Sequence, residues 1–182
     1  GRMFARINSL GVYALNGFSV SVEADISGGL PQFTIVGLPD SAVREATDRV
    51  RSALKNLSFV WPVSRITVNL APGDIRKTGP VYDLPVLLAI LAASGQLPVP
   101  GPEDAFIGEL SLDGGVRSVT GVLPMALAAV QQGVRHLFVP AENAAEAAAA
   151  GALCVYPVHT ALDAVRHLTG EAHIEPAQPA AF

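Results

Sequence analysis

A chain of 182 residues is long enough for one sizeable domain that buries its own core without a disulfide or a metal staple. Its formal net charge of −4 argues against a domain that is basic throughout, so any contact with nucleic acid must be local. Charged residues make up 15% of the chain, against about 25% in ordinary soluble domains, which indicates apolar surface that meets a partner or a neighbouring domain. The single cysteine, Cys154, rules out an intramolecular disulfide and favours a reducing, cytoplasmic location.

The two ends of the chain differ in composition from its interior. Gly1-Arg2 before Met3 resembles a cloning scar, and residues 171–182 are rich in Ala, Pro, Glu and Gln, which is typical of a linker. No run approaches eighteen apolar residues, so we expect no membrane contact. The folded domain is therefore expected over residues 3–170.

The first half of the chain predicts three strands and a helix. Residues 18–26 alternate apolar and polar side chains, the pattern of a half-buried strand. Asn16-Gly17 before them is a strong turn signal, which predicts a hairpin with a strand over 4–10. A third strand is expected over 33–36. Asp40 is expected to cap a helix that runs to about Leu57 and places on one apolar stripe Val43, Ala46, Val50, Leu54 and Leu57.

A strand, a long loop and a helix follow over residues 65–95. The alternation in 65–70 predicts a strand, and the turn residues of 71–74 end it. Asp83 is a good helix N-cap before a run of leucines. Because this arrangement often holds a catalytic or phosphate-binding loop, residues 71–82 are the first candidate site.

The second half alternates strand and helix, which predicts an α/β domain with a mixed sheet. The expected elements are a hairpin around Asp113-Gly114-Gly115, a helix over 121–132 capped by Thr120, strands over 136–139 and 153–156, a helix after Asn143 with Glu146 as its capping box, and a last helix capped by Thr160 and Asp163 that ends near Gly170.

Patterns for nucleotide and metal binding are missing from the sequence. Residues 73–79 contain Lys77-Thr78 but lack the glycine that a P-loop places before its lysine. The four histidines, His136, His159, His167 and His173, have no metal-ligand spacing. Cys154 lies in an apolar run and is expected to be a buried structural thiol.

Two groups of basic residues are candidates for DNA contact. Arg76 and Lys77 would form a basic finger on the loop before Asp83, and Arg44, Arg51 and Lys55 lie on one face of the helix over 40–57. The alternatives are a surface loop whose charges only keep it soluble, and a solvated helix face with ion pairs such as Arg44–Asp48.

The blocks GLPDSAVREA and NLAPGDIRKTGPVYDLP resemble the N-terminal domain of the ComM/YifB proteins, which are bacterial AAA+ ATPases similar to the magnesium chelatase I subunit. The resemblance runs from Met3 to about Gly170. It implies that residues 171–182 lead to an AAA+ ATPase module, which would bind ATP and Mg²⁺, and that this domain needs no cofactor. It also implies a hexameric helicase for DNA branch migration in natural transformation and recombination, with single-stranded or branched DNA as a partner.

The same domain is similar to the Lon protease catalytic domain. This implies a Lon-like, ribosomal-protein-like two-layer α/β (α+β) fold with a mixed sheet and packed helices. Lon carries its nucleophilic serine in a K-D-G-P-S-A-G block, which Lys77-Thr78-Gly79-Pro80 matches, so Val81 stands at the serine position. Its lysine base lies in a G-G-L-K-E-K block, which residues 120–125 match, so Leu123 stands at the lysine position. Val81 has no hydroxyl and Leu123 has no amine, so these two positions cannot form the serine–lysine dyad that nucleophilic peptide cleavage needs.

Three functions stay open on the sequence. The first is a non-catalytic domain for ring assembly and DNA contact in a ComM-like helicase. The second is a residual Lon-type peptidase with a displaced nucleophile such as Thr78 or Tyr82. The third is a purely structural oligomerisation domain.

Overall fold

The structure, a computed structural model, describes residues 3–178 and begins with a long antiparallel hairpin of β1 (Met3–Tyr13) and β2 (Asn16–Ser27). The expected turn at Asn16-Gly17 is wrong by two residues, because Tyr13 pairs with Asn16 and the turn is Ala14-Leu15. Gly17 has a different purpose. A Cβ at that position would lie 2.3 Å from the backbone oxygen of Pro124, so only glycine lets the hairpin approach the helix that contains Pro124.

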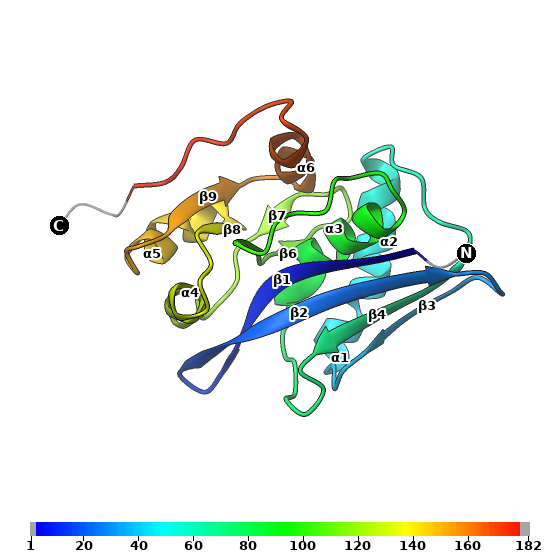
Figure 1. The fold of residues 1–182 in the computed structure, drawn as a ribbon, viewed down its shortest axis with the longest axis horizontal. Helices are drawn as coiled ribbons and strands as arrows, with labels where there is room; N and C mark the ends of the chain where they lie inside the picture. The colour runs from blue at the N-terminus through cyan, green and yellow to red at the C-terminus, as the bar shows by residue number, and fades with distance from the viewer. Residues whose placement is uncertain (1–2, 179–182) are drawn as a thin grey trace.

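The main sheet has seven strands in the order β3-β4-β2-β1-β5-β8-β9 (Figure 1). Strand β2 runs antiparallel to β1 and β4, and the remaining neighbours are parallel. The further strands are β3 (Gln32–Val36), β4 (Arg65–Ala71), β5 (Asp104–Phe106), β8 (His136–Pro140) and β9 (Cys154–Val158). A separate hairpin of β6 (Glu109–Leu110) and β7 (Val116–Arg117) forms around Asp113, as predicted.

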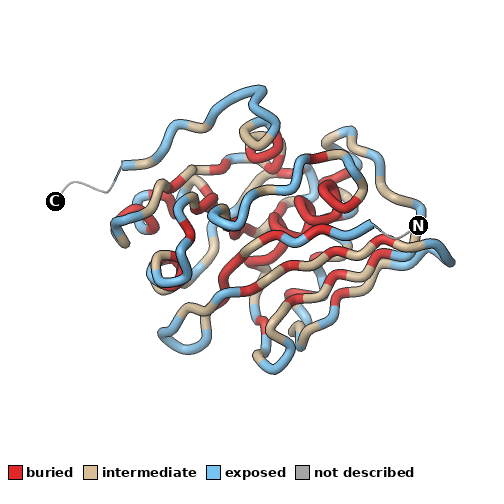
Figure 2. Tube along the Cα trace, in the orientation of Figure 1, coloured by how far each residue is buried: buried red, intermediate tan, exposed pale blue. Residues whose placement is uncertain are grey.

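Helices pack against this sheet, and the predicted mixed α/β class is confirmed. They are α1 (Ser41–Arg44), α2 (Ala46–Asn56), α3 (Asp83–Ala93), α4 (Val122–Gln131), α5 (Ala144–Ala148) and α6 (Ala161–Thr169), with 3₁₀ turns η1 (Pro80–Tyr82) and η2 (Ala141–Asn143). Every residue of α3 is buried, because it lies between the sheet and α2 (Figures 1 and 2). Its run of leucines is therefore a core helix without an exposed face.

Of the predicted caps of α1, α4, α5 and α6, two are confirmed and two are wrong. Asp40 caps α1, accepting from the Val43 nitrogen at 2.8 Å, and Thr160 with Asp163 forms the predicted capping box of α6. Thr120 is not a cap, because α4 begins after Gly121 in the left-handed region. Asn143 is not a cap either, since its side chain binds both backbone groups of Val119, at 2.9 and 3.1 Å.

The single helix expected over 40–57 is interrupted at Glu45, which ends α1 and precedes α2. The Thr47 hydroxyl donates to the Arg44 carbonyl at 3.1 Å, and this local bond competes with the helical ladder. The predicted stripe is buried at Val43, Ala46, Val50 and Leu54, whereas Leu57, at its end, is only partly buried against the core.

After α6 the described chain has no regular secondary structure, but it lies back along β9. The Ile174 nitrogen donates to His167 Nδ1 at 3.0 Å, and the Ala177 nitrogen donates to the Val155 carbonyl at 2.8 Å. Residues 1–2, expected to be a cloning scar, and 179–182 of the expected linker lie outside the described residues. Within the described range, no helix has the length and apolar character needed to cross a bilayer.

Candidate functional site

The loop between β4 and α3 holds one exposed cation and one buried cation. Arg76 is exposed, but Lys77 is fully buried, with Nζ donating to the Gly37 carbonyl at 2.9 Å and to the Pro72 carbonyl. Burial lowers the pKa of Lys77, and the charge of Asp74 opposes that shift. The predicted finger of two exposed charges is therefore wrong for Lys77. Sequence reasoning missed this because a lysine in a polar loop is normally solvated.

Backbone and carboxylate bonds fix the shape of this loop. Its Lys77 nitrogen donates to the Leu38 carbonyl, and its Lys77 carbonyl accepts from the Asp40 nitrogen, both at 2.9 Å. Asp40 also accepts from the Gly79 nitrogen at 3.1 Å while it caps α1. One carboxylate thus joins the start of α1 to the loop.

A buried ion pair fixes the helix that follows. Asp83 is fully buried and accepts from Arg49 Nε at 2.6 Å, from Arg49 Nη2 at 3.1 Å and from the Leu110 nitrogen at 2.9 Å. Burial raises the pKa of Asp83, although the bond from Arg49 and the one from Leu110 oppose it. The bond to Asp83 raises the pKa of Arg49. Asp83 is therefore an anchor between α3, α2 and β6, rather than the N-cap that the sequence predicted.

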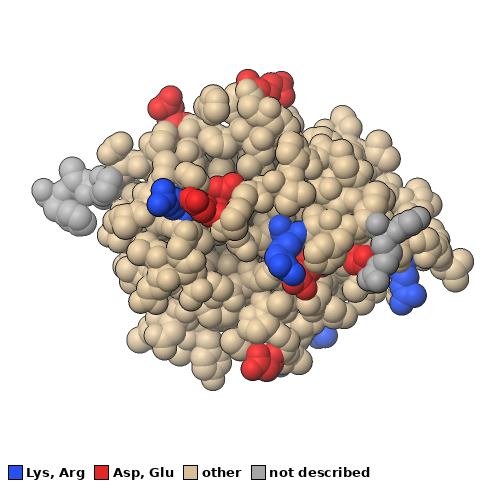
Figure 3. Space-filling view, viewed as in Figure 1, with Lys and Arg blue, Asp and Glu red and all other residues tan. Residues whose placement is uncertain are grey.

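The basic residues of α1 and α2 remain on the surface. Arg44, Arg51 and Lys55 are exposed, and the Arg51 guanidinium lies 5.3 Å from the centre of the Trp61 ring. Within the described chain, Arg44–Asp48 and Asp48–Arg51 do not form ion pairs; Arg49 pairs with Glu45 at 3.4 Å instead. Figure 3 shows charged side chains in separate groups, some of mixed sign, on a largely uncharged face.

A pocket of about 250 Å³ lies where the Lon-like blocks meet. Residues 78–81 line one side, and residues 118–120 with Met125 line the other. Val81, which the resemblance to Lon places at the serine position, is part of the lining. Leu123, which the same resemblance places at the lysine position, is a partly exposed residue of α4 outside the pocket. None of the described lining residues carries an amine, imidazole or carboxylate.

In the part of the chain that the structure describes, the hydroxyl groups that line this pocket form no hydrogen bond with a basic side chain. Thr78, Ser118 and Thr120 line it, but the nearest lysine in sequence, Lys77, directs its amine to the Gly37 and Pro72 carbonyls. Tyr82 is buried, and that burial raises the pKa of its phenol far above the ordinary value. Neither group matches the activated nucleophile that a displaced peptidase site requires.

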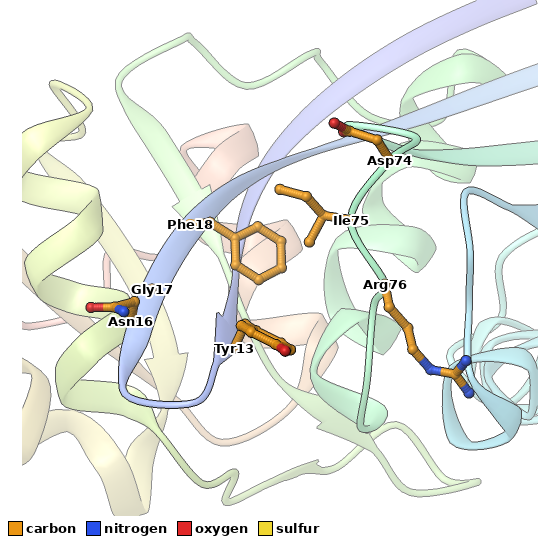
Figure 4. A pocket seen from close by; sticks show the side chains of 7 residues that line it. All are labelled: Tyr13, Asn16, Gly17, Phe18, Asp74, Ile75 and Arg76. Atoms are coloured by element: carbon orange, nitrogen blue, oxygen red, sulfur yellow. The ribbon is translucent and has the colours of Figure 1, made fainter.

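A second pocket, of about 390 Å³, opens between the hairpin end and the β4–α3 loop (Figure 4). The hairpin contributes Tyr13, Asn16, Gly17 and Phe18, and the loop contributes Asp74, Ile75 and Arg76. Sequence reasoning missed this pocket, because its two walls are about sixty positions apart and join only through the fold.

His136 and Cys154 pair across the neighbouring strands β8 and β9. His136 Nδ1 lies 2.8 Å from Asp104 Oδ1, and the thiol expected to be buried, Cys154, is only half-buried on the edge strand β9. Among residues 3–178, no group of three or more His, Cys, Asp or Glu side chains is placed to hold a metal ion.

This chain is similar to known proteins of several names, among them ComM, YifB and Lon protease. The competence protein ComM of Haemophilus influenzae is 47% identical over 153 residues, which are 84% of this chain and 30% of that protein. YifB of Escherichia coli is 42% identical over 138 residues, which are 75% of this chain and 27% of that protein. Lon protease of Clostridioides difficile is 26% identical over 147 residues, covering 77% of this chain and 19% of the protease. This chain therefore spans less than a third of the ComM and YifB proteins that it matches.

The sequence pattern of one protein family matches the central part of the chain. That family is described as the subunit ChlI of Mg-chelatase, and its pattern matches residues 22–143, more than half of the chain. The chain therefore belongs to the Mg-chelatase ChlI family, with ComM and YifB proteins among its relatives, which confirms the resemblance found in the sequence.

Proposed function

We propose that this chain is the non-catalytic N-terminal domain of a ComM-like AAA+ DNA helicase, and that it serves ring assembly and DNA contact. The full-length protein would drive branch migration of DNA in natural transformation and recombination. ATP and Mg²⁺ would bind its AAA+ module, outside this domain, and the working form would be a cytoplasmic hexameric ring.

The observation that carries this proposal is the β4–α3 loop and its continuation into η1. At the end of this segment, Val81, which the resemblance to Lon places at the serine position, lines a pocket whose described lining holds no base. On the same loop, Arg76 is exposed and has no described ion-pair partner. A segment without the groups for peptide cleavage still offers a positive charge for phosphate.

DNA contact is tested by fluorescence anisotropy with labelled single-stranded and branched DNA at low and moderate salt. We expect binding that weakens with salt, and a weaker affinity and shallower salt slope for Arg76→Ala. Arg65→Ala is the matched control, since Arg65 is also exposed but lies at the opposite end of β4. No binding at low salt, or equal losses in both variants, would contradict the role of Arg76.

A residual peptidase is the second candidate, because three hydroxyl groups line the pocket at Val81. Incubation with an unfolded protein substrate should give no cleavage above a buffer control. Cleavage that disappears in Thr78→Val would show that a displaced nucleophile is active and would overturn the non-catalytic assignment.

Ring assembly is supported by apolar side chains on the surface, of which Leu15, Leu30 and Val63 are each more than 80% exposed. Light scattering on the full-length protein with ATP and Mg²⁺ should show a hexamer. A full-length protein that stays monomeric under these conditions would exclude this part of the proposal.

A further inference from the structure

The pocket at the hairpin end has a floor built around a glycine. Gly11 pairs with Phe18 across the hairpin, and a Cβ on Gly11 would lie 2.6 Å from Phe18 Cζ and 2.3 Å from the Tyr82 hydroxyl. Only glycine therefore lets the Phe18 ring lie against the β1 backbone. The β1 backbone at Gly11 supports the Phe18 ring, which therefore forms a fixed apolar floor of the pocket.

The walls of this pocket are aromatic and aliphatic. Tyr13 is 71% exposed although it is a large aromatic residue, and Figure 4 shows the Tyr13 and Phe18 rings and the Ile75 side chain around the same space. The volume of about 390 Å³ lies within the roughly 300–1,000 Å³ of small-molecule sites. Rings with accessible faces stack on nucleobases of any sequence.

The charges beside the pocket favour an anion on one side. Arg76 extends from the loop away from the pocket (Figure 4), and within the described chain it has no ion-pair partner. Asp74 lies at another edge of the pocket, but the Lys77 ammonium is close enough for the two charges to interact. A phosphate would therefore be favoured beside Arg76 and disfavoured beside Asp74.

We infer that the pocket of Tyr13, Phe18 and Ile75 takes an unpaired nucleobase of single-stranded DNA, with the flanking phosphate on Arg76. This inference rests on the proposed DNA contact and adds to it a preference for unpaired strands. Paired bases are stacked within a duplex and leave no face for Tyr13. The domain would thus hold the single strands that a branched DNA exposes.

The experiment compares two oligonucleotides of equal length and charge, a thymidine oligomer and the same strand with abasic sites, by fluorescence anisotropy. The thymidine strand should bind about ten-fold more tightly, which is 1.4 kcal/mol and within the measured range for stacking of one base on an aromatic ring. Tyr13→Ala should remove this difference, and Tyr13→Phe, which keeps the ring, should retain it. Arg76→Ala should weaken both strands alike, whereas Asp74→Asn should tighten both.

Two further results separate the failure of this inference from the failure of the proposed function. Equal binding of both strands, with a salt slope that depends on Arg76, would keep DNA contact and reject the base pocket. No binding of either strand would reject both. Val99→Ala is the control, since Val99 is 58% exposed but outside the pocket. If Tyr13→Ala, and not Val99→Ala, reduces self-association and leaves strand discrimination intact, the pocket binds protein instead of a base.

Discussion

Replacing Arg49 with methionine should test how strongly the buried ion pair stabilises the fold. Asp83 accepts three hydrogen bonds, of which Arg49 donates two, and its side chain is fully buried. The variant leaves this carboxylate with the Leu110 nitrogen alone. Removing one partner of such a pair costs about 3–5 kcal/mol, which for a chain of this size lowers Tm by roughly 6–20 °C.

The cost should depend on pH, and its sign follows from the pKa of Asp83. Burial already raises that pKa in the folded state, so the folded state holds the proton more tightly than the unfolded state does. The free energy of unfolding therefore falls as the pH rises from the ordinary pKa of an aspartate through the raised pKa of Asp83 in the folded state. Without Arg49 the pKa rises further, so the destabilisation should be smaller at pH 4.5 than at pH 7, because a protonated Asp83 carries no charge.

Urea unfolding at both pH values measures these effects. Glu45→Ala is the control, because Glu45 contacts the same guanidinium at 3.4 Å from the surface and should cost about 0–1 kcal/mol. The double variant Arg49→Met with Asp83→Leu should recover stability, leaving about 1–3 kcal/mol for the unpaired Leu110 nitrogen. A double variant less stable than Arg49→Met, or a loss independent of pH, would refute the assigned role of the pair.

Three further variants test other parts of the structure by urea unfolding. Gly17→Ala should cost about 1–3 kcal/mol, because its Cβ would meet the Pro124 carbonyl, whereas Gly28→Ala, which meets nothing within 4 Å, should cost far less. Lys77→Met should lose about 1–3 kcal/mol by leaving two carbonyls without their donor, and a loss of DNA affinity without a loss of stability would contradict this. Burial lowers the pKa of His167, beside His173, His136 and Asp104, so its neutral form stabilises the fold above about pH 6.5 and that contribution is lost as the pH falls. His167→Gln should therefore flatten the decline in the free energy of unfolding between pH 7.5 and 5.5. An unchanged decline would exclude His167 as its source.

The elements that local patterns control were predicted well. The alternation of β2, the buried stripe of α1 and α2, and the Thr160 capping box each depend on residues a few positions apart. Errors arose where a distant contact decides the outcome. Gly17 is needed where β2 approaches α4, and the Asn143 side chain, directly before α5, binds the Val119 backbone instead of capping the helix. A single sequence contains no local signal for either contact.

The candidate site was predicted in position but not in geometry. The Lon-like blocks located the loop, and Val81 does line a pocket between them. The division of Arg76 and Lys77 between solvent and interior was missed, because it depends on the Gly37 and Pro72 carbonyls. Asp83 offered one signal: a carboxylate at the start of an entirely apolar helix needs a buried partner, and Arg49 is that partner.

The same buried groups support the proposed role of this loop in binding. Asp40 joins the loop to α1, and the Lys77 ammonium donates to the Gly37 and Pro72 carbonyls. Asp83 anchors α3, the helix that follows the loop. A loop held in this way loses little conformational entropy when a ligand binds. Arg76 and Ile75 are therefore presented from a fixed backbone, opposite a Phe18 ring that Gly11 keeps in place. The bond from the Gly79 nitrogen to Asp40 lies at the pocket that Val81 lines, but it uses the backbone of Gly79, so this support does not depend on the side chain at position 81.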